Sequence, residues 1–193
     1  MTDQKDKPVL DQQTFEKLLE AGYVIQEHGR KMQEGSPQDV YTRPTSRFVA
    51  GFLGASNLLD GRVEERGATD ATVLVDGGSV IHVPADRLNG SAPEVRVGVR
   101  PEKIRLERDE GEPERGWNWV RGLLRMATFV GVSHQYSIDG PGGKPLTVYA
   151  QNVGHGTVPH PGEHVRLMWR PEHTFVVIPD PTNPNGDAGE EEQ

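Results

Sequence analysis

The sequence contains no cysteine in 193 residues, which excludes a disulfide framework, thiol catalysis and thiolate metal sites. Long apolar runs are missing too: no stretch approaches the roughly 18 apolar residues that span a bilayer. The polar start MTDQKDKPVLDQQ has no signal-peptide core. We therefore expect a cytoplasmic protein without direct membrane insertion. Aromatic residues make up only 6%, so the hydrophobic core must be thin.

Negative charge is concentrated at the C-terminal end. The formal net charge is −8, and the tail after Pro179 carries acids but no base. The stretch 180–193, DPTNPNGDAGEEEQ, has no apolar periodicity and is expected to be a disordered acidic tail. The body of the chain is nearly neutral and has no basic stripe. A nucleic-acid partner is therefore not expected.

Motifs that carry chemistry are absent as well. A phosphate-binding loop requires G-x-x-x-x-G-K-[ST], and the nearest string, residues 142–145 (GGKP), has proline in place of the hydroxyl. The hydrolase motif G-x-S-x-G does not occur. His155, His160 and His164 would suit zinc, but prolines flank His160 in a loop, which favours no metal. The sequence predicts no enzyme activity, no catalytic residue, no cofactor and no metal site.

The N-terminal third is predicted to be helical. Residues 11–33 have apolar side chains at helical spacing and Asp11 in a capping position, which predicts one amphipathic helix. Ser36 followed by Pro37 predicts the start of a short helix over residues 37–41.

A second short helix is predicted directly after the first. Pro44 turns the chain, and Thr45 or Ser46 can cap a helix that Gly54 ends. This helix carries four apolar residues: Phe48, Val49, Phe52 and Leu53.

From Asn57 onward, short β-branched runs alternate with turn residues, which indicates a barrel or sandwich. The runs are TVLV, SVIHV, VRVGV, KIRL, GLLRMATFV, QYSI, LTVYA, HVRLMW and TFVVI. An internal repeat lies within them, because residues 95–102 (VRVGVRPE) and 165–172 (VRLMWRPE) share five of eight positions. We infer two related β units that pack together, with Val97, Val99, Leu167 and Trp169 facing a shared core.

Each repeat ends in a pair of opposite charges, Arg100 with Glu102 and Arg170 with Glu172. Paired charges can perform acid/base catalysis. Because one active site seldom requires two copies, we interpret these residues as local ion pairs or interdomain contacts.

Several motifs together resemble a known family. Residues 29–41 (GRKMQEGSPQDVY), the motifs R-P, R-F-V-A and F-L-G over 43–54, and the two R-P-E strands are similar to ATP-binding subunits of ABC importers of the polyamine, ferric-iron and sugar type. In that family the G-R-x-x-Q-x-G run is the last strand of the nucleotide-binding domain. The helices that follow lead into the transport-associated OB (TOBE) region. The resemblance implies a mainly β fold of two OB-like barrel units, preceded by an N-terminal helix and short hinge helices.

The resemblance also implies an organisation and a function. We expect a helix and motor-junction remnant over 1–34, a helical hinge over 35–56 and a TOBE-like duplicated domain over 57–179. The expected function is a non-catalytic accessory or regulatory module of an ABC importer, peripheral to the inner face of the membrane. It would dock on an ATPase or permease subunit, or on its own copy as a dimer, through Phe15, Leu18 and the hinge. The alternatives are a free-standing oxyanion-type ligand-binding module and an inactive remnant of a transporter ATPase.

Overall fold

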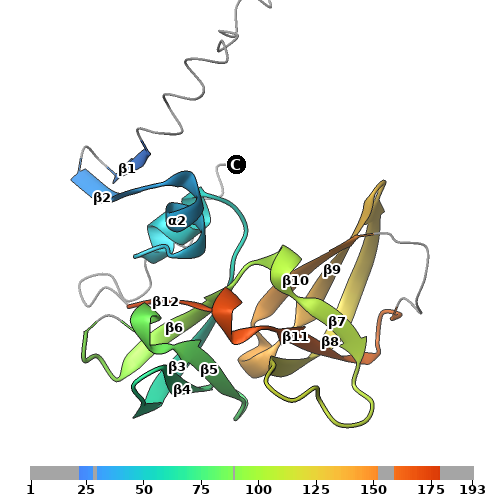
Figure 1. The fold of residues 1–193 in the computed structure, drawn as a ribbon. Helices are drawn as coiled ribbons and strands as arrows, with labels where there is room; N and C mark the ends of the chain where they lie inside the picture. Colours follow the sequence, from blue (N-terminus) through green and yellow to red (C-terminus); the bar gives the residue numbers. More distant parts are fainter. Residues whose placement is uncertain (1–21, 28–29, 89, 152–158, 179–193) are drawn as a thin grey trace, which may run out of the picture.

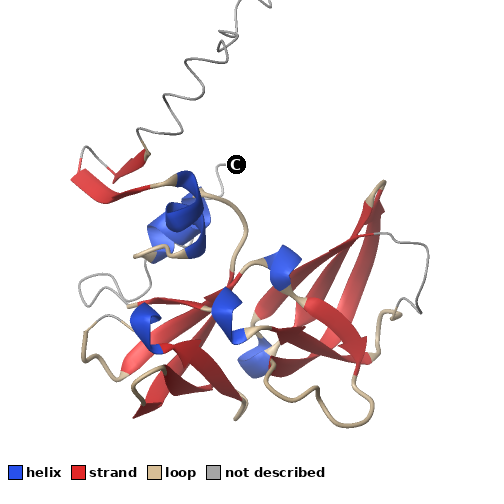
Figure 2. Cartoon of the chain, in the orientation of Figure 1, coloured by secondary structure: helices blue, strands red, loops and turns tan. Residues whose placement is uncertain are grey.

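The computed structural model describes residues 22–27, 30–88, 90–151 and 159–178, and these are mainly strands (Figures 1 and 2). The predicted helix 11–33 is wrong over its described part, because the chain there forms an antiparallel hairpin of β1 (Tyr23–Glu27) and β2 (Arg30–Gly35). Gly22 precedes β1 with φ +73, and a Cβ there would lie 2.7 Å from the Gly35 carbonyl oxygen. This close approach and left-handed backbone are incompatible with a helix through residue 22. Residues 11–21 lie outside the described part.

Two short helices follow the hairpin, as the sequence predicts. In α2 (Pro37–Thr42) the Ser36 hydroxyl accepts a hydrogen bond from the Asp39 amide at 3.1 Å. In α3 (Arg47–Phe52) Ser46 is the cap, and its hydroxyl accepts from the Val49 amide at 3.2 Å. Both serines satisfy amides that have no partner within their helices. The helix–proline–helix connector is confirmed.

The rest of the described chain forms two five-stranded antiparallel sheets. The first has the order β12-β6-β3-β4-β5 and the second β10-β9-β8-β11-β7. The strands of the first sheet are β3 (Asn57–Arg66), β4 (Asp70–Val75), β5 (Val80–Pro84), β6 (Glu94–Val99) and β12 (Phe175–Val177). Those of the second are β7 (Arg105–Arg108), β8 (Asn118–Val130), β9 (Ser133–Asp139), β10 (Pro145–Gln151) and β11 (His164–Trp169). The 3-10 turns are η1 (Ala85–Arg87), η2 (Pro101–Lys103), η3 (Pro141–Gly143) and η4 (Pro171–His173).

The two units exchange their last strands. After β6 in the first sheet, the Arg-Pro-Glu turn η2 sends β7 into the second sheet, beside β11. After β11, the turn η4 sends β12 back into the first sheet, beside β6. Gly98 and Met168 occupy equivalent positions of the repeat, as do Arg105 and Phe175. Gly98 pairs with Phe175, and Met168 pairs with Arg105, so both crossings have the same register. Each unit is therefore completed by the other.

The main hydrophobic core is one cluster that draws buried residues from both sheets. Val97, Val99, Leu167 and Trp169 are buried in one hydrophobic cluster, which confirms the predicted shared core. The mainly β fold with two related units is confirmed as well. Among the described strands of these two sheets, β3 is the strand that the nine β-branched runs did not predict. Its apolar residues are interrupted by Asp60, Gly61 and Arg62.

Candidate functional site: the hinge junction

The end of β6 holds the hinge through Arg100, which is only 2% exposed. Its Nη1 donates to the carbonyl oxygen of Ala50 at 2.8 Å and to the hydroxyl of Ser56 at 2.6 Å. Its Nη2 donates to the carbonyl oxygen of Tyr41 at 2.9 Å. The two carbonyl acceptors lie near the C-terminal ends of α2 and α3, where carbonyl groups have no helical partner. Burial lowers the pKa of Arg100, so the surrounding oxygens must compensate for its desolvation.

Tyr41 connects the two charges of the first Arg-Pro-Glu motif. The Arg100 guanidinium lies 4.1 Å from the centre of the Tyr41 ring, and the Tyr41 hydroxyl donates to Glu102 at 2.7 Å. Burial, followed by the hydrogen bond to Glu102 and its charge, raises the pKa of Tyr41 to about 12. Of the two interpretations of the Arg-Glu pair, the structure therefore favours an interdomain contact.

A second basic residue, missed by the sequence analysis, holds the end of α2. Arg87 of η1 donates from Nη1 to the carbonyl oxygen of Thr42 at 3.0 Å. Beside it, Arg43 of the hinge forms an ion pair with Asp86 at 3.0 Å. Burial, followed by the nearby charge of Arg43, lowers the pKa of Arg87. Arg87 and Arg100 thus bind consecutive carbonyl groups at the same helix end.

The apolar residues of the hinge differ in exposure. Val49 is fully buried in a cluster with Ile25 of β1 and Val40 of α2, and Phe48 and Leu53 pack against that cluster while half-buried. Phe52 is 64% exposed. The hairpin β1–β2 therefore covers one side of the hinge helices and leaves Phe52 uncovered. The other two residues predicted for this surface, Phe15 and Leu18, lie outside the described residues.

The second Arg-Pro-Glu motif does not meet the hinge. Arg170 and Glu172 are exposed, and the Arg170 guanidinium lies 4.5 Å from the centre of the Trp117 ring. Trp117 also stacks with Arg105 at 4.3 Å. The structure thus brings together Phe48, Val49, Phe52, Leu53, Arg100 and Glu102 but places Arg170 and Glu172 elsewhere. Of the two Arg-Pro-Glu motifs, the first has its arginine buried and hydrogen-bonded to the hinge, whereas the arginine of the second is exposed.

Two asparagines bind the units to each other. Asn57 at the start of β3 donates to the Thr147 carbonyl oxygen and accepts from the Thr147 amide, both at 2.7 Å. Asn118 at the start of β8 donates to the His82 carbonyl oxygen at 2.7 Å and accepts from the His82 amide at 2.8 Å. Both asparagines are buried. The sequence analysis missed this pair, although residues 57–61 (NLLDG) and 118–122 (NWVRG) share the pattern Asn-x-x-x-Gly.

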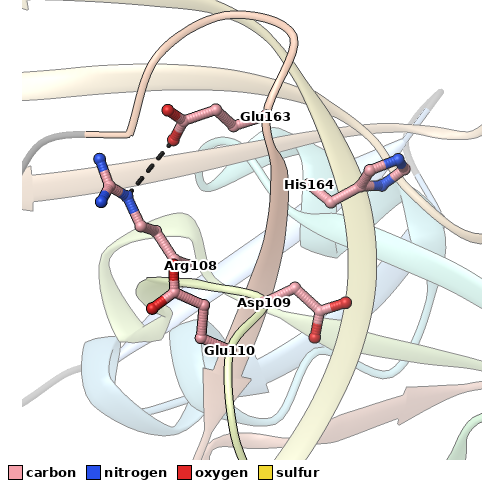
Figure 3. Close-up of a pocket in the computed structure, with 5 residues that line it drawn as sticks. All are labelled: Arg108, Asp109, Glu110, Glu163 and His164. Carbon is pink, nitrogen blue, oxygen red and sulfur yellow. Dashed lines mark ion pairs between the residues drawn. The ribbon is translucent and has the colours of Figure 1, made fainter.

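A surface hollow lies at the edge of the second sheet (Figure 3). It is lined by Arg108, Asp109, Glu110, Glu163 and His164, from the end of β7 and the start of β11. Figure 3 shows Arg108 and Glu163 turned toward each other, with Nε of Arg108 3.4 Å from Glu163 Oε2. Three carboxylates outnumber the bases here. Such a hollow disfavours an oxyanion.

The carboxylate of Asp109 in this hollow forms ion pairs with two arginines, Arg121 and Arg166. Burial acts to raise its pKa, but hydrogen bonds from Arg166 and Arg121 outweigh this effect, and the pKa lies below its usual value. The distances are 2.8 Å to Arg166 Nη2 and 2.7 Å to Arg121 Nε. Asp109 is therefore a structural ion-pair partner that anchors the linker between β7 and β8.

The described part of the structure does not bring the three histidines considered for zinc into one site. His160 and His164 are exposed, and His155 lies outside the described part. Across residues 22–27, 30–88, 90–151 and 159–178, no group of three or more metal-ligating side chains is arranged to hold an ion. No helix in these ranges is long and apolar enough to cross a membrane.

Comparisons with known proteins agree with this architecture. Residues 97–177 match the family model of the TOBE domain. The chain is 36% identical to the spermidine/putrescine import ATP-binding protein PotA of Frankia alni, over 82% of this chain and 36% of that protein. It is 31% identical to the putrescine transport ATP-binding protein PotG of Escherichia coli, over 84% of this chain and 44% of that protein. The chain thus spans about two-fifths of the length of these curated relatives.

A solved structure shares the fold. It is the cytoplasmic molybdate-binding protein ModG with molybdate bound, with a TM-score of 0.53 and 19% identity, over 64% of this chain and 96% of that one. At this identity the likeness shows the fold alone. The duplicated β region, the family match and the importer relatives lead to one conclusion: the chain carries the TOBE region of ABC-importer ATP-binding subunits.

Proposed function

We propose that the chain is a non-catalytic accessory module of an ABC importer, of polyamine-like type, that mediates assembly or regulation. The TOBE match and the import relatives support this class of function. The sequence also lacks a phosphate-binding loop. In this proposal the chain acts in the cytoplasm, at the inner face of the membrane, through a transporter complex.

The observation that carries the proposal is the way Arg100 fixes the hinge. Arg100 fastens the ends of α2 and α3 to the β units, while Phe52 remains exposed on the side that the β1–β2 hairpin does not cover. A hinge that is already held in place loses less conformational entropy on binding than a flexible connector would. A rigid hinge with an exposed aromatic residue is therefore suited to docking. The proposed organisation is a junction over 1–34, a hinge over 35–56, a duplicated domain over 57–179 and a tail over 180–193.

Binding to transporter subunits tests the proposal. The full chain should bind the ATP-binding or permease subunit of an ABC importer from the same organism, measured by calorimetry with purified components. Absence of binding to every ATPase and permease subunit of the organism's importers would overturn it. Self-association through the hinge is the other outcome that the sequence predicts, and the same measurement on the chain alone detects it.

The oxyanion alternative finds no support in the hollow of Figure 3. Its lining carries Asp109, Glu110 and Glu163, which repel an anion. The likeness to ModG concerns the fold.

A further inference from the structure

A side chain of the β1–β2 hairpin, Gln33 of β2, binds the turn between the two hinge helices. Its Nε2 donates to the carbonyl oxygen of Arg43 at 2.9 Å. Its Oε1 accepts from the Thr45 amide at 2.9 Å and from the Thr45 hydroxyl at 3.2 Å. The side-chain amide therefore binds backbone groups on both sides of Pro44, which is itself buried.

The first β unit binds the two carbonyl groups that come directly before that of Arg43. Arg100 donates to the carbonyl oxygen of Tyr41 at 2.9 Å, and Arg87 donates to that of Thr42 at 3.0 Å. Three consecutive carbonyl groups are thus bound by three different side chains. Two of these side chains come from the β units and one comes from the hairpin.

The stretch over residues 41–45, which we call the shared segment, places three parts of the chain in series. An isolated two-stranded hairpin has little stability, so its position depends on what it packs against. The buried Ile25 of β1 packs with Val40 and Val49 of the hinge helices. Figure 1 shows these helices between the hairpin and the first sheet. The described contacts therefore run from the hairpin to the hinge, and from the hinge to the β units.

We propose that the shared segment is a rigid coupling through which a displacement of the hairpin is transmitted to the β units. Hydrogen bonds hold it from both sides, and the ring of Pro44 fixes one of its backbone dihedrals, so it has little freedom to absorb a displacement. Coupling between distant sites is carried by such contiguous hydrogen-bonded elements. A partner that moves the hairpin therefore moves the β units with it. Gln33 is a positioning residue in this device.

Distances between spin labels test the two joints of the coupling separately. The chain contains no cysteine, so labels attach only at introduced cysteines. Val24→Cys marks the hairpin, Gln38→Cys marks the hinge and Val80→Cys marks the β units, all at exposed positions. In the otherwise unmodified full chain, electron paramagnetic resonance should give a single narrow distance distribution for each pair of labels.

Gln33→Ala should loosen the joint between the hairpin and the hinge. The hairpin–hinge and hairpin–β-unit distributions should broaden at least about twofold, because the hairpin has little stability of its own. The hinge–β-unit distribution should keep its width, since Arg87 and Arg100 still hold the hinge. The matched control is Gln26→Ala, at an exposed glutamine of the same hairpin, which should leave all the distributions unchanged.

Arg100→Lys should loosen the other joint. Lysine keeps the charge, but one ammonium group cannot replace a planar guanidinium that binds several oxygens at once. The hinge–β-unit and hairpin–β-unit distributions should broaden, and the hairpin–hinge distribution should stay narrow. Arg87→Ala, which leaves Arg100 in place, should change the same two distributions in the same direction and serves as the second variant if Arg100→Lys does not fold.

The same measurements can overturn the proposal in three ways. A broad hairpin–β-unit distribution in the unmodified chain would show that no position is transmitted. An unchanged distribution in Gln33→Ala would show that the hairpin is held without this side chain. If the arginine variants fold and leave the hairpin–β-unit distribution narrow, the hinge does not lie in series between the two parts.

Discussion

Arg100 contacts both the ring and the backbone of Tyr41: the guanidinium stacks 4.1 Å from the ring centre, and its Nη2 and Nε donate to the Tyr41 carbonyl oxygen at 2.9 and 3.3 Å. One side chain thereby binds both the ring and the backbone at the end of α2. The orientation of the hinge relative to the β units depends on this contact, together with the bond from Arg87 to Thr42.

Arg100→Ala should destabilise the protein strongly. It leaves the carbonyl groups of Tyr41 and Ala50 without their charged donor, and we expect a loss of about 3 kcal/mol in the free energy of unfolding. Urea denaturation followed by circular dichroism measures it. The repeat supplies the control, since Arg170→Ala, at an exposed residue that stacks on Trp117, should cost less than about 1 kcal/mol. Equal effects of both substitutions would contradict the asymmetry of the two motifs.

Tyr41 should stabilise the hinge up to high pH. Its pKa in the folded state is about 12, raised from 10.0, so its stabilising contribution is present below pH 10 and is lost as pH rises through 12. The ultraviolet absorbance of tyrosinate, compared between the unmodified chain and Tyr41→Phe, reports this titration. The difference should show a group ionising well above the ordinary range. Ionisation of Tyr41 near its ordinary pKa would contradict its burial and its contact with Glu102.

Asn57→Ala and Asn118→Ala should each cost about 2 kcal/mol, because each leaves a backbone amide and a carbonyl group unsatisfied between the units. The two costs should be similar because the asparagines occupy equivalent positions in the two units. Gln135→Ala, at an exposed side chain of β9, is the control and should change the free energy of unfolding by less than about 0.5 kcal/mol. Thermal unfolding compares the three variants, and an unchanged midpoint in either asparagine variant would contradict the role given to it.

Phe52→Asp should abolish binding to the transporter subunit without changing the stability of the chain, because Phe52 is largely exposed. The control is Val80→Asp, which alters an exposed apolar residue of β5 away from the hinge. Calorimetric titration of each variant against the ATP-binding subunit measures the effect. If Phe52→Asp binds as the unmodified chain does, the docking surface lies elsewhere.

The purified chain should neither bind nor hydrolyse ATP, because its sequence contains no phosphate-binding loop. Phosphate release and fluorescence of a nucleotide analogue are the measurements. Activity that persists through repeated purification would contradict this expectation.

The sequence by itself determined the local features. Serine caps with proline at Pro37 and Pro44 predict the two hinge helices, because a cap acts on amides within one turn. β-Branched runs between turn residues predict most of the strands, and the repeated R-P-E strand predicts the duplication. The N-terminal helix was predicted wrongly over 22–27 and 30–33, because spacing alone does not register the approach of Gly22 to Gly35.

Tertiary structure decided how these elements are joined. The exchange of β7 and β12 between sheets depends on pairing between residues as distant in sequence as Arg96 and Val177, and no local pattern encodes which sheet receives a strand. Arg100 and Arg170 stand in the same motif, yet one is buried against helix ends and the other is exposed. The sequence does not distinguish them, because burial depends on what the rest of the chain packs against each motif. The hinge helices cover the first motif, and the linker residue Trp117 contacts the second.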